Sequence, residues 1–176
     1  MQILSKNSNE TVKLGEEIGK KLSGGEVIAL YGDLGGGKTQ FAKGIARGLG
    51  IKDNIISPTF VIRREYRLDS RRMFTRPLAG GNDKEGVIRR SSGKKLNLLH
   101  YDFYRFEVPD RELVESMEEG INPDNVTVIE WAERVEKYLP KDAIKITFKY
   151  ISENEREIEI TPGSQDLEDK FSKLSF

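Results

Sequence analysis

The stretch that decides the fold is EVIALYGDLGGGKTQFAKGIARGLG, residues 26–50. It opens with a short apolar run, 26–31, of the kind that forms a strand buried on both faces. From Lys38 onward the apolar residues keep helical spacing, and Gly50 closes that predicted helix. A glycine-rich turn, 32–37, joins the two elements. A strand, a glycine-rich turn and a helix in this order predict an anion site at the start of the helix.

The turn matches the pattern G-x-x-x-x-G-K-[ST] with Gly32, Gly37, Lys38 and Thr39 at its fixed positions. Glycines allow backbone conformations that are closed to other residues, so successive N–H groups can converge on one anion. Lys38 would then reach the β- and γ-phosphates, and the Thr39 hydroxyl could ligate Mg²⁺. The turn therefore predicts a nucleoside triphosphate bound with magnesium.

The composition limits the remaining classes of function. The chain has 176 residues, which suits one domain, and equal numbers of basic and acidic side chains, 29 each. Overall attraction to nucleic acid or membranes is therefore not indicated. With no cysteine and one histidine, disulfides, thiol catalysis and multi-histidine metal sites are excluded. Because the N-terminus lacks a signal-peptide core and no apolar run nears the roughly 20 residues that span a bilayer, we expect a cytoplasmic protein with no membrane contact.

The rest of the chain alternates between helical and strand patterns. Helices are predicted over 9–22 and around Leu113, Val114 and Met117; strands are predicted over 59–68, 96–104 and 126–131, and a C-terminal β-hairpin at a sheet edge over 143–160. Interleaved strands and helices predict an α/β fold. We expect a three-layer P-loop NTPase sandwich with a mixed, mainly parallel sheet. The single ATPase domain would span 1–162, followed by a tail or short helix over 163–176.

Residues 69–95 do not fit this pattern. They have little periodicity and carry eight basic side chains against three acidic ones. Two interpretations stay open for this basic loop insertion: a solvated, mobile loop, or an arm that binds an anion, a partner or tRNA.

Two carboxylates follow predicted strands, where α/β proteins place their ligands. In HYDFYR, residues 100–105, alternation puts His100, Asp102 and Tyr104 on one face. In VIEWAER, residues 128–134, an apolar strand ends in Glu130, which is the Walker B pattern. We expect both carboxylates at the phosphate site, and the sequence leaves open which one binds the metal directly. His100 is interpreted as a structural residue.

Taken together, the motifs resemble the TsaE family, the small bacterial P-loop ATPases formerly called YjeE. The resemblance rests on TVKLG, GDLGGGKT, SPTF, HYDFYR and IEWAER, which occur in the family's order and near its spacing. It covers nearly the whole chain apart from 69–95 and the tail. There are two departures: Gly36 stands where alanine is usual, and the stretch between Tyr66 and His100 is longer than expected.

The resemblance implies an ATP-hydrolysing accessory protein that works with TsaB and TsaD. Together, these proteins would make the threonylcarbamoyl modification on the adenosine next to the anticodon in ANN-decoding tRNAs. ATP hydrolysis would reset the complex between turnovers, and tRNA would be met through the complex, with direct contact left open.

The resemblance also assigns roles to residues. Lys38, Asp102 and Glu130 would be catalytic, and Thr39, Glu130 and Asp102 would hold Mg²⁺. Ser57 and Thr59 of SPTF would sense the γ-phosphate, and Thr11 would lie near the adenine. The implied nucleotide-binding residues are Thr11, Gly32, Asp33, Leu34, Gly35, Gly36, Gly37, Lys38, Thr39, Gln40 and Trp131. From the residues alone, Trp131 is equally well interpreted as a packing side chain.

Three hypotheses for the function stay open at this point. The first is an ATPase that is weak alone and stimulated by partners, for which Arg105 and Arg134 are possible sources of activating charge in the chain itself. The second is a small-molecule or nucleotide kinase, with 69–95 as its lid. The third is a nucleotide-dependent binding module in which conformation matters more than hydrolysis.

Overall fold

The computed structural model describes residues 1–52, 55, 57–58, 63–67, 96–172 and 174. The basic segment 69–95 and residues 59–60 of SPTF lie outside the described residues. Both interpretations of the basic segment therefore concern residues that the structure does not describe.

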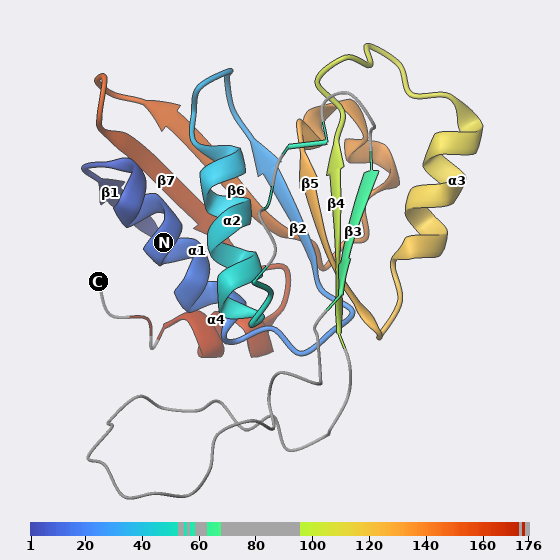
Figure 1. Cartoon of the computed structure of the whole chain (residues 1–176), viewed down its shortest axis with the longest axis horizontal. Helices are drawn as coiled ribbons and strands as arrows, with labels where there is room; N and C mark the ends of the chain where they lie inside the picture. Colours follow the sequence, from blue (N-terminus) through green and yellow to red (C-terminus); the bar gives the residue numbers. More distant parts are fainter. Residues whose placement is uncertain (53–54, 56, 59–62, 68–95, 173, 175–176) are drawn as a thin grey trace, which may run out of the picture.

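The described residues form one seven-stranded sheet in the order β1-β7-β6-β2-β5-β4-β3 (Figure 1). The central strands β6, β2, β5 and β4 are parallel to one another, whereas β7, β1 and β3 are antiparallel to their neighbours. This is the mixed sheet with a parallel centre that the sequence predicted. The strands are β1 (Gln2–Ser5), β2 (Val27–Tyr31), β3 (Arg63–Arg67), β4 (Asn97–Asp102), β5 (Asn125–Glu130), β6 (Ile144–Tyr150) and β7 (Arg156–Thr161).

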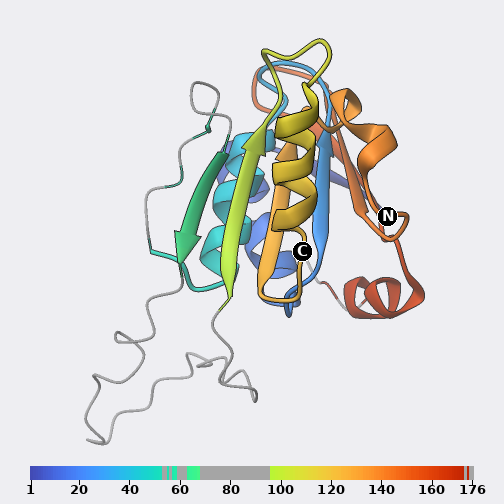
Figure 2. The ribbon, with the colours of Figure 1, turned by 90° about the vertical axis from the view of Figure 1, so that its right-hand side faces the viewer.

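Helices cover both faces of the sheet and give the expected three layers (Figure 2). α1 (Ser8–Gly19) and α2 (Lys38–Gly48) lie on one face, and α3 (Arg111–Gly120) lies on the other. Two short 3₁₀ turns, η2 (Ala132–Arg134) and η3 (Glu136–Tyr138), follow β5, and α4 (Gln165–Phe171) follows the last strand. None of the helices in the described ranges is long and apolar enough to cross a membrane.

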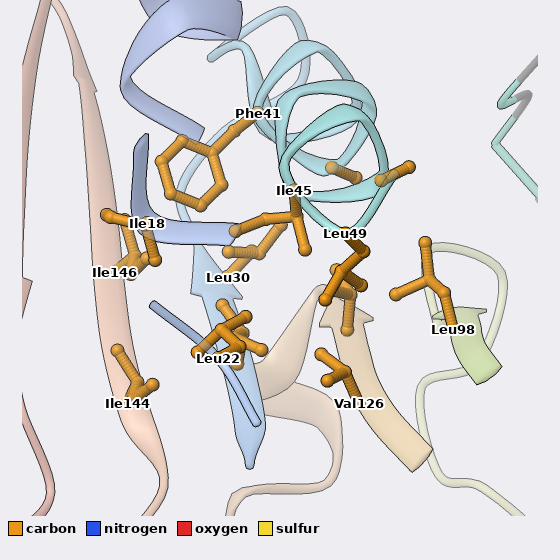
Figure 3. Close-up of a cluster of buried hydrophobic side chains, with 14 of the residues drawn as sticks. Ile18, Leu22, Leu30, Phe41, Ile45, Leu49, Leu98, Val126, Ile144 and Ile146 are labelled. Atoms are coloured by element: carbon orange, nitrogen blue, oxygen red, sulfur yellow. The ribbon is translucent and has the colours of Figure 1, made fainter. Parts of the chain in front are cut away.

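The strands β2, β5 and β4 are buried on both sides, which gives the molecule two hydrophobic clusters. In β2, Ile28 and Leu30 join the cluster under α1 and α2, whereas Val27 and Ala29 join the cluster on the α3 side. Figure 3 shows the first cluster, where side chains of α2 such as Ile45 pack onto the sheet. Burial of each such side chain contributes about 1.5–3 kcal/mol.

The predicted helices and strands are confirmed within a few residues wherever the structure describes them, but two points differ. The hairpin is not at an edge: β6 pairs with β2, and β7 is covered by β1. The strand β1 itself was not predicted, because four residues are too few to show an alternating pattern. The tail forms α4, whose Leu167 and Phe171 are buried in the cluster under α1 and α2.

Glycines bring α1 and α2 into backbone contact. A Cβ added at Gly44 of α2 would lie 2.1 Å from the carbonyl oxygen of Val12, and one at Gly15 of α1 would lie 2.4 Å from that of Phe41. Gly19 and Gly48 repeat the contact one turn on. This close packing fixes the axis of α2, and with it the direction in which its first residues point.

We expect Gly44→Ala to lower the free energy of unfolding by about 1–3 kcal/mol, because an inserted methyl group forces the two helix backbones apart. The measurement is the midpoint of thermal or urea unfolding. Arg47→Ala is the matched control, since Arg47 is exposed on the same helix. If the two variants unfolded at the same midpoint, the close contact of the two helix backbones would not determine the stability of the protein.

Candidate nucleotide-binding site

The glycine-rich turn adopts the backbone conformations that its sequence requires. Gly32, Gly35 and Gly37 have φ angles of 120°, 76° and 102°, in the region that other residues rarely enter. At Gly32 a Cβ would also lie 2.3 Å from the carbonyl oxygen of Phe148 in β6. Gly36 is outside this region, and its added Cβ would come only within 3.0 Å of the Asp33 carbonyl oxygen. The position where the family usually has alanine is thus the one at which the turn least requires glycine.

Lys38 is the first residue of α2, and only 4% of its surface is exposed. Its Nζ donates to the carbonyl oxygens of Gly32 and Asp33, the latter at 2.8 Å. The same atom lies 4.0 Å from the ring centroid of Trp131, a cation–π distance. Burial lowers the pKa of Lys38, and the nearby Glu130 carboxylate opposes this shift.

Thr39 and Glu130 connect α2 to the end of β5. The Thr39 hydroxyl donates to Glu130 Oε2 at 2.9 Å, and Glu130 Oε1 lies 2.8 Å from Nε2 of His100. Glu130 and His100 are 2% and 0% exposed. A buried carboxylate is costly unless hydrogen bonds satisfy it, and here each of its two oxygens has a partner.

Asp102 ends β4 in register with Glu130 of β5. Its Oδ1 accepts from the backbone N–H of Tyr104 at 2.9 Å, and its Oδ2 accepts from the Ser57 hydroxyl. The register and the pleat direct both carboxylates to the α2 side of the sheet, while Tyr101 joins the opposite cluster. The predicted convergence of the two carboxylates is therefore observed.

These groups surround a cavity of about 360 Å³, within the size range of small-molecule sites. It is lined by Leu34, Gly35, Gly36, Gly37, Lys38, Thr39, Gln40, Ser57, Asp102, Tyr104, Glu130 and Trp131. Gly32, Asp33 and Thr11 are not among them. The first two contribute carbonyl groups to Lys38, and the Thr11 hydroxyl is hydrogen-bonded to Ser5 at 2.8 Å.

Trp131 lies at a position that is compatible with both of its interpretations from the sequence. It packs against the α3-side cluster, and it also lines the cavity, with its ring centroid 5.0 Å from that of Tyr104. Its φ of 59° is the one positive value for a non-glycine residue in the described part of the chain. A bulky residue in this conformation costs free energy, and such residues concentrate at binding sites.

Arg156 of β7 is a residue that the sequence did not point to. Its Nε and Nη2 donate to the carbonyl oxygen of Gly35 at 3.2 and 3.0 Å. Its Nη1 donates to carbonyl oxygens in the β6–β7 turn, and its guanidinium lies 4.7 Å from the Tyr150 ring centroid. The hairpin thereby holds the tip of the phosphate loop, residues 32–39, which comprises the glycine-rich turn and the first two residues of α2. A separation of 121 residues hides this contact from any local pattern.

The model of the family described as threonylcarbamoyl adenosine biosynthesis protein TsaE matches residues 5–76 and 87–158. The chain belongs to the TsaE family. The resemblance that the motifs suggested is therefore confirmed, and the glycine-rich loop and both carboxylates lie within the matched residues.

Relatives named tRNA threonylcarbamoyladenosine biosynthesis protein TsaE are similar along nearly their whole length. One from Bacillus subtilis is 34% identical, with 96% of this chain and 90% of the relative covered. One from Treponema pallidum is 31% identical, with 91% and 99% covered. The crystal structure of Bacillus subtilis YdiB superposes with a TM-score of 0.70 at 28% identity, over 98% of this chain and 92% of that one. The α/β fold is that of this structural neighbour.

Replacement of Arg156 by Ala is expected to weaken nucleotide binding, measured with ADP as the probe, roughly tenfold, because the loss of its hydrogen bonds frees the carbonyl of Gly35 to reorient. Isothermal titration calorimetry measures the change. Arg156→Lys should restore little, since an ammonium group cannot make the two-pronged contact. Lys149→Ala, at an exposed position of the same hairpin, is the control. Wild-type affinity in Arg156→Ala would exclude this role for the hairpin.

Proposed function

We propose that this chain binds and hydrolyses ATP with Mg²⁺ as an accessory protein in the threonylcarbamoyl modification of the adenosine next to the anticodon of ANN-decoding tRNAs. It would act with TsaB and TsaD, meet tRNA through that complex, and reset the complex between turnovers. The observation that carries the proposal is the hydrogen bond of 2.9 Å from Thr39, in the phosphate loop, to Glu130, at the end of β5. It joins the two halves of a nucleotide–magnesium site in a chain of the TsaE family.

Phosphate binding would use the loop and Lys38. Backbone N–H groups at the start of α2 point toward an anion there, and the helix dipole favours negative charge. Lys38 donates to two carbonyl oxygens, which carry only partial charge. Phosphate oxygens carry full charge and form stronger hydrogen bonds, so Lys38 would exchange its carbonyl partners for the β- and γ-phosphates.

The residues present also fit magnesium. The described residues contain no cluster of three or more His, Asp or Glu side chains that could enclose a metal ion. Magnesium at phosphate sites needs no such cluster, because one or two carboxylates, the phosphates and waters complete its ligands. Thr39 and Glu130 would hold it, and the bound ion neutralises charge that develops on the phosphate oxygens.

Asp102 would orient the attacking water. Its carboxylate lines the same cavity as Glu130 but is directed by Ser57 and Tyr104 rather than by Thr39. This separation of partners supports Glu130 as the direct metal ligand and Asp102 as the group beside the water. Ser57 precedes the rest of SPTF, so a change at the γ-phosphate would reach that segment through the hydrogen bond of Ser57 to Asp102.

We expect ATP turnover by the purified chain to be slow and to rise by a factor on the order of 10³ or more when TsaB and TsaD are added. No arginine of the described part of the chain lines the cavity, so Arg105 and Arg134 are not among its lining residues. Charge for the transition state would then come from a partner. Release of free phosphate is the measurement. Equal turnover with and without TsaB and TsaD would contradict activation by these partners. Phosphate transferred to another molecule would instead favour a kinase.

The roles within the site are separated by two variants. Lys38→Ala should abolish turnover and weaken nucleotide binding, because the loop loses its only lysine side chain at the phosphates. Asp102→Asn should bind ATP nearly as wild type does but hydrolyse it at least tenfold more slowly, since only the water-orienting charge is removed. Calorimetry and single-turnover hydrolysis report the two effects. Full turnover in Lys38→Ala would overturn the site assignment.

The same Asp102 variant distinguishes hydrolysis as a reset from nucleotide-dependent binding alone. With TsaB, TsaD and tRNA present, a reset step predicts that Asp102→Asn supports one round of modification and then stops. Repeated rounds of modification without hydrolysis of the bound ATP would show that the ATP-bound conformation is sufficient to support the reaction.

A further inference from the structure

His100 is a fully buried polar side chain with an apolar neighbour in register on β5 and Arg64 in register on β3. It lies in β4 in register with Val128 of β5, on the sheet face that also carries Leu98 and Val126. An aliphatic side chain would suit such a position better unless the imidazole made a specific hydrogen bond. The partner is Glu130, whose Oε1 lies 2.8 Å from Nε2 of the ring.

The hydrogen-bond partners determine where the ring proton lies. An ionised carboxylate only accepts hydrogen bonds, so Nε2 must carry the proton that it shares with Glu130. Nδ1 is buried and has no partner among the residues that the structure describes. A second N–H at Nδ1 would be a buried donor without an acceptor, which costs more than an unpaired lone pair. The surroundings therefore favour a ring whose proton lies on Nε2.

We propose that His100 is a positioning residue that fixes the carboxylate of Glu130 for magnesium. The imidazole N–H binds Oε1 on the sheet side, which leaves Oε2 facing the Thr39 hydroxyl. Without this N–H the carboxylate could rotate, and either oxygen or both could turn toward α2. This inference rests on the proposed function, because it assigns His100 a role in presenting a metal ligand.

The first test reads the tautomer directly. The chain has one histidine, so ¹⁵N-resolved NMR of the imidazole gives a single, unambiguous set of signals. We expect a protonated Nε2 and a bare Nδ1, in a ring that does not exchange between tautomers. A proton on Nδ1, or an averaged ring, would contradict the proposed pairing with Glu130. This measurement requires neither nucleotide nor metal.

The second test uses two variants with opposite hydrogen-bonding capacity. His100→Phe keeps a ring but removes the donor, whereas His100→Gln places an amide N–H near the position of Nε2. Calorimetry would compare the affinity for AMP-PNP in Mg²⁺ and in EDTA. We expect the magnesium-dependent gain in affinity to fall about tenfold or more in His100→Phe, with the affinity in EDTA changed less than twofold, and to recover largely in His100→Gln.

A magnesium-dependent gain that is unchanged in His100→Phe would overturn the positioning role. Loss of affinity in EDTA as well, without recovery in His100→Gln, would show a structural role only. Thermal unfolding of both variants checks that they fold; if His100→Phe does not, the NMR result and His100→Gln still decide the matter. If the wild-type chain itself gained no affinity from magnesium, the proposed function would fail, whereas the tautomer would still test the His100–Glu130 contact.

Discussion

The hydrogen bond between Thr39 and Glu130 is the constraint that joins the phosphate loop to the sheet. It forms because Leu30, near the end of β2, is in register with Glu130 of β5, so both strands end at the same height. The glycine-rich turn then reverses the chain into α2 over that edge. Contact of α2 with α1 at Gly15 and Gly44 fixes the direction of α2, and the first turn of the helix is held against the carboxylate. A change in strand register or in helix packing would separate the two groups.

The site brings a lysine, two carboxylates and an imidazole into one largely buried region. Burial of charged groups is unfavourable unless their hydrogen bonds are satisfied, and here neighbouring side chains and backbone groups satisfy nearly all of them. Lys38 uses the carbonyls of its own loop, and Glu130 uses His100 and Thr39. These partners stabilise the buried arrangement of the lysine, the two carboxylates and the imidazole.

Much of this arrangement could be predicted from the sequence, because it depends on local patterns. The strand–turn–helix order around Gly32 and Lys38 is contained in fewer than about thirty residues, the usual length of such a unit. Asp102 and Glu130 followed from the rule that parallel strands present ligands at their carboxyl ends. The contact of His100 with Glu130 did not follow, because it depends on the register of two strands and on a side-chain conformation. A lone histidine in a strand is more often structural than functional, so the sequence favours a structural role for His100.

The position of the C-terminal hairpin shows why the remainder could not be predicted. An antiparallel pair after the last predicted parallel strand suggests an edge, yet β6 lies beside β2 and β1 covers β7. This central position lets the hairpin touch the phosphate loop twice, through the Phe148 carbonyl at Gly32 and through Arg156 at Gly35. The loop is thus held by α2 at one end and by the hairpin along its length. A loop fixed at both places has little freedom to close over a ligand by itself.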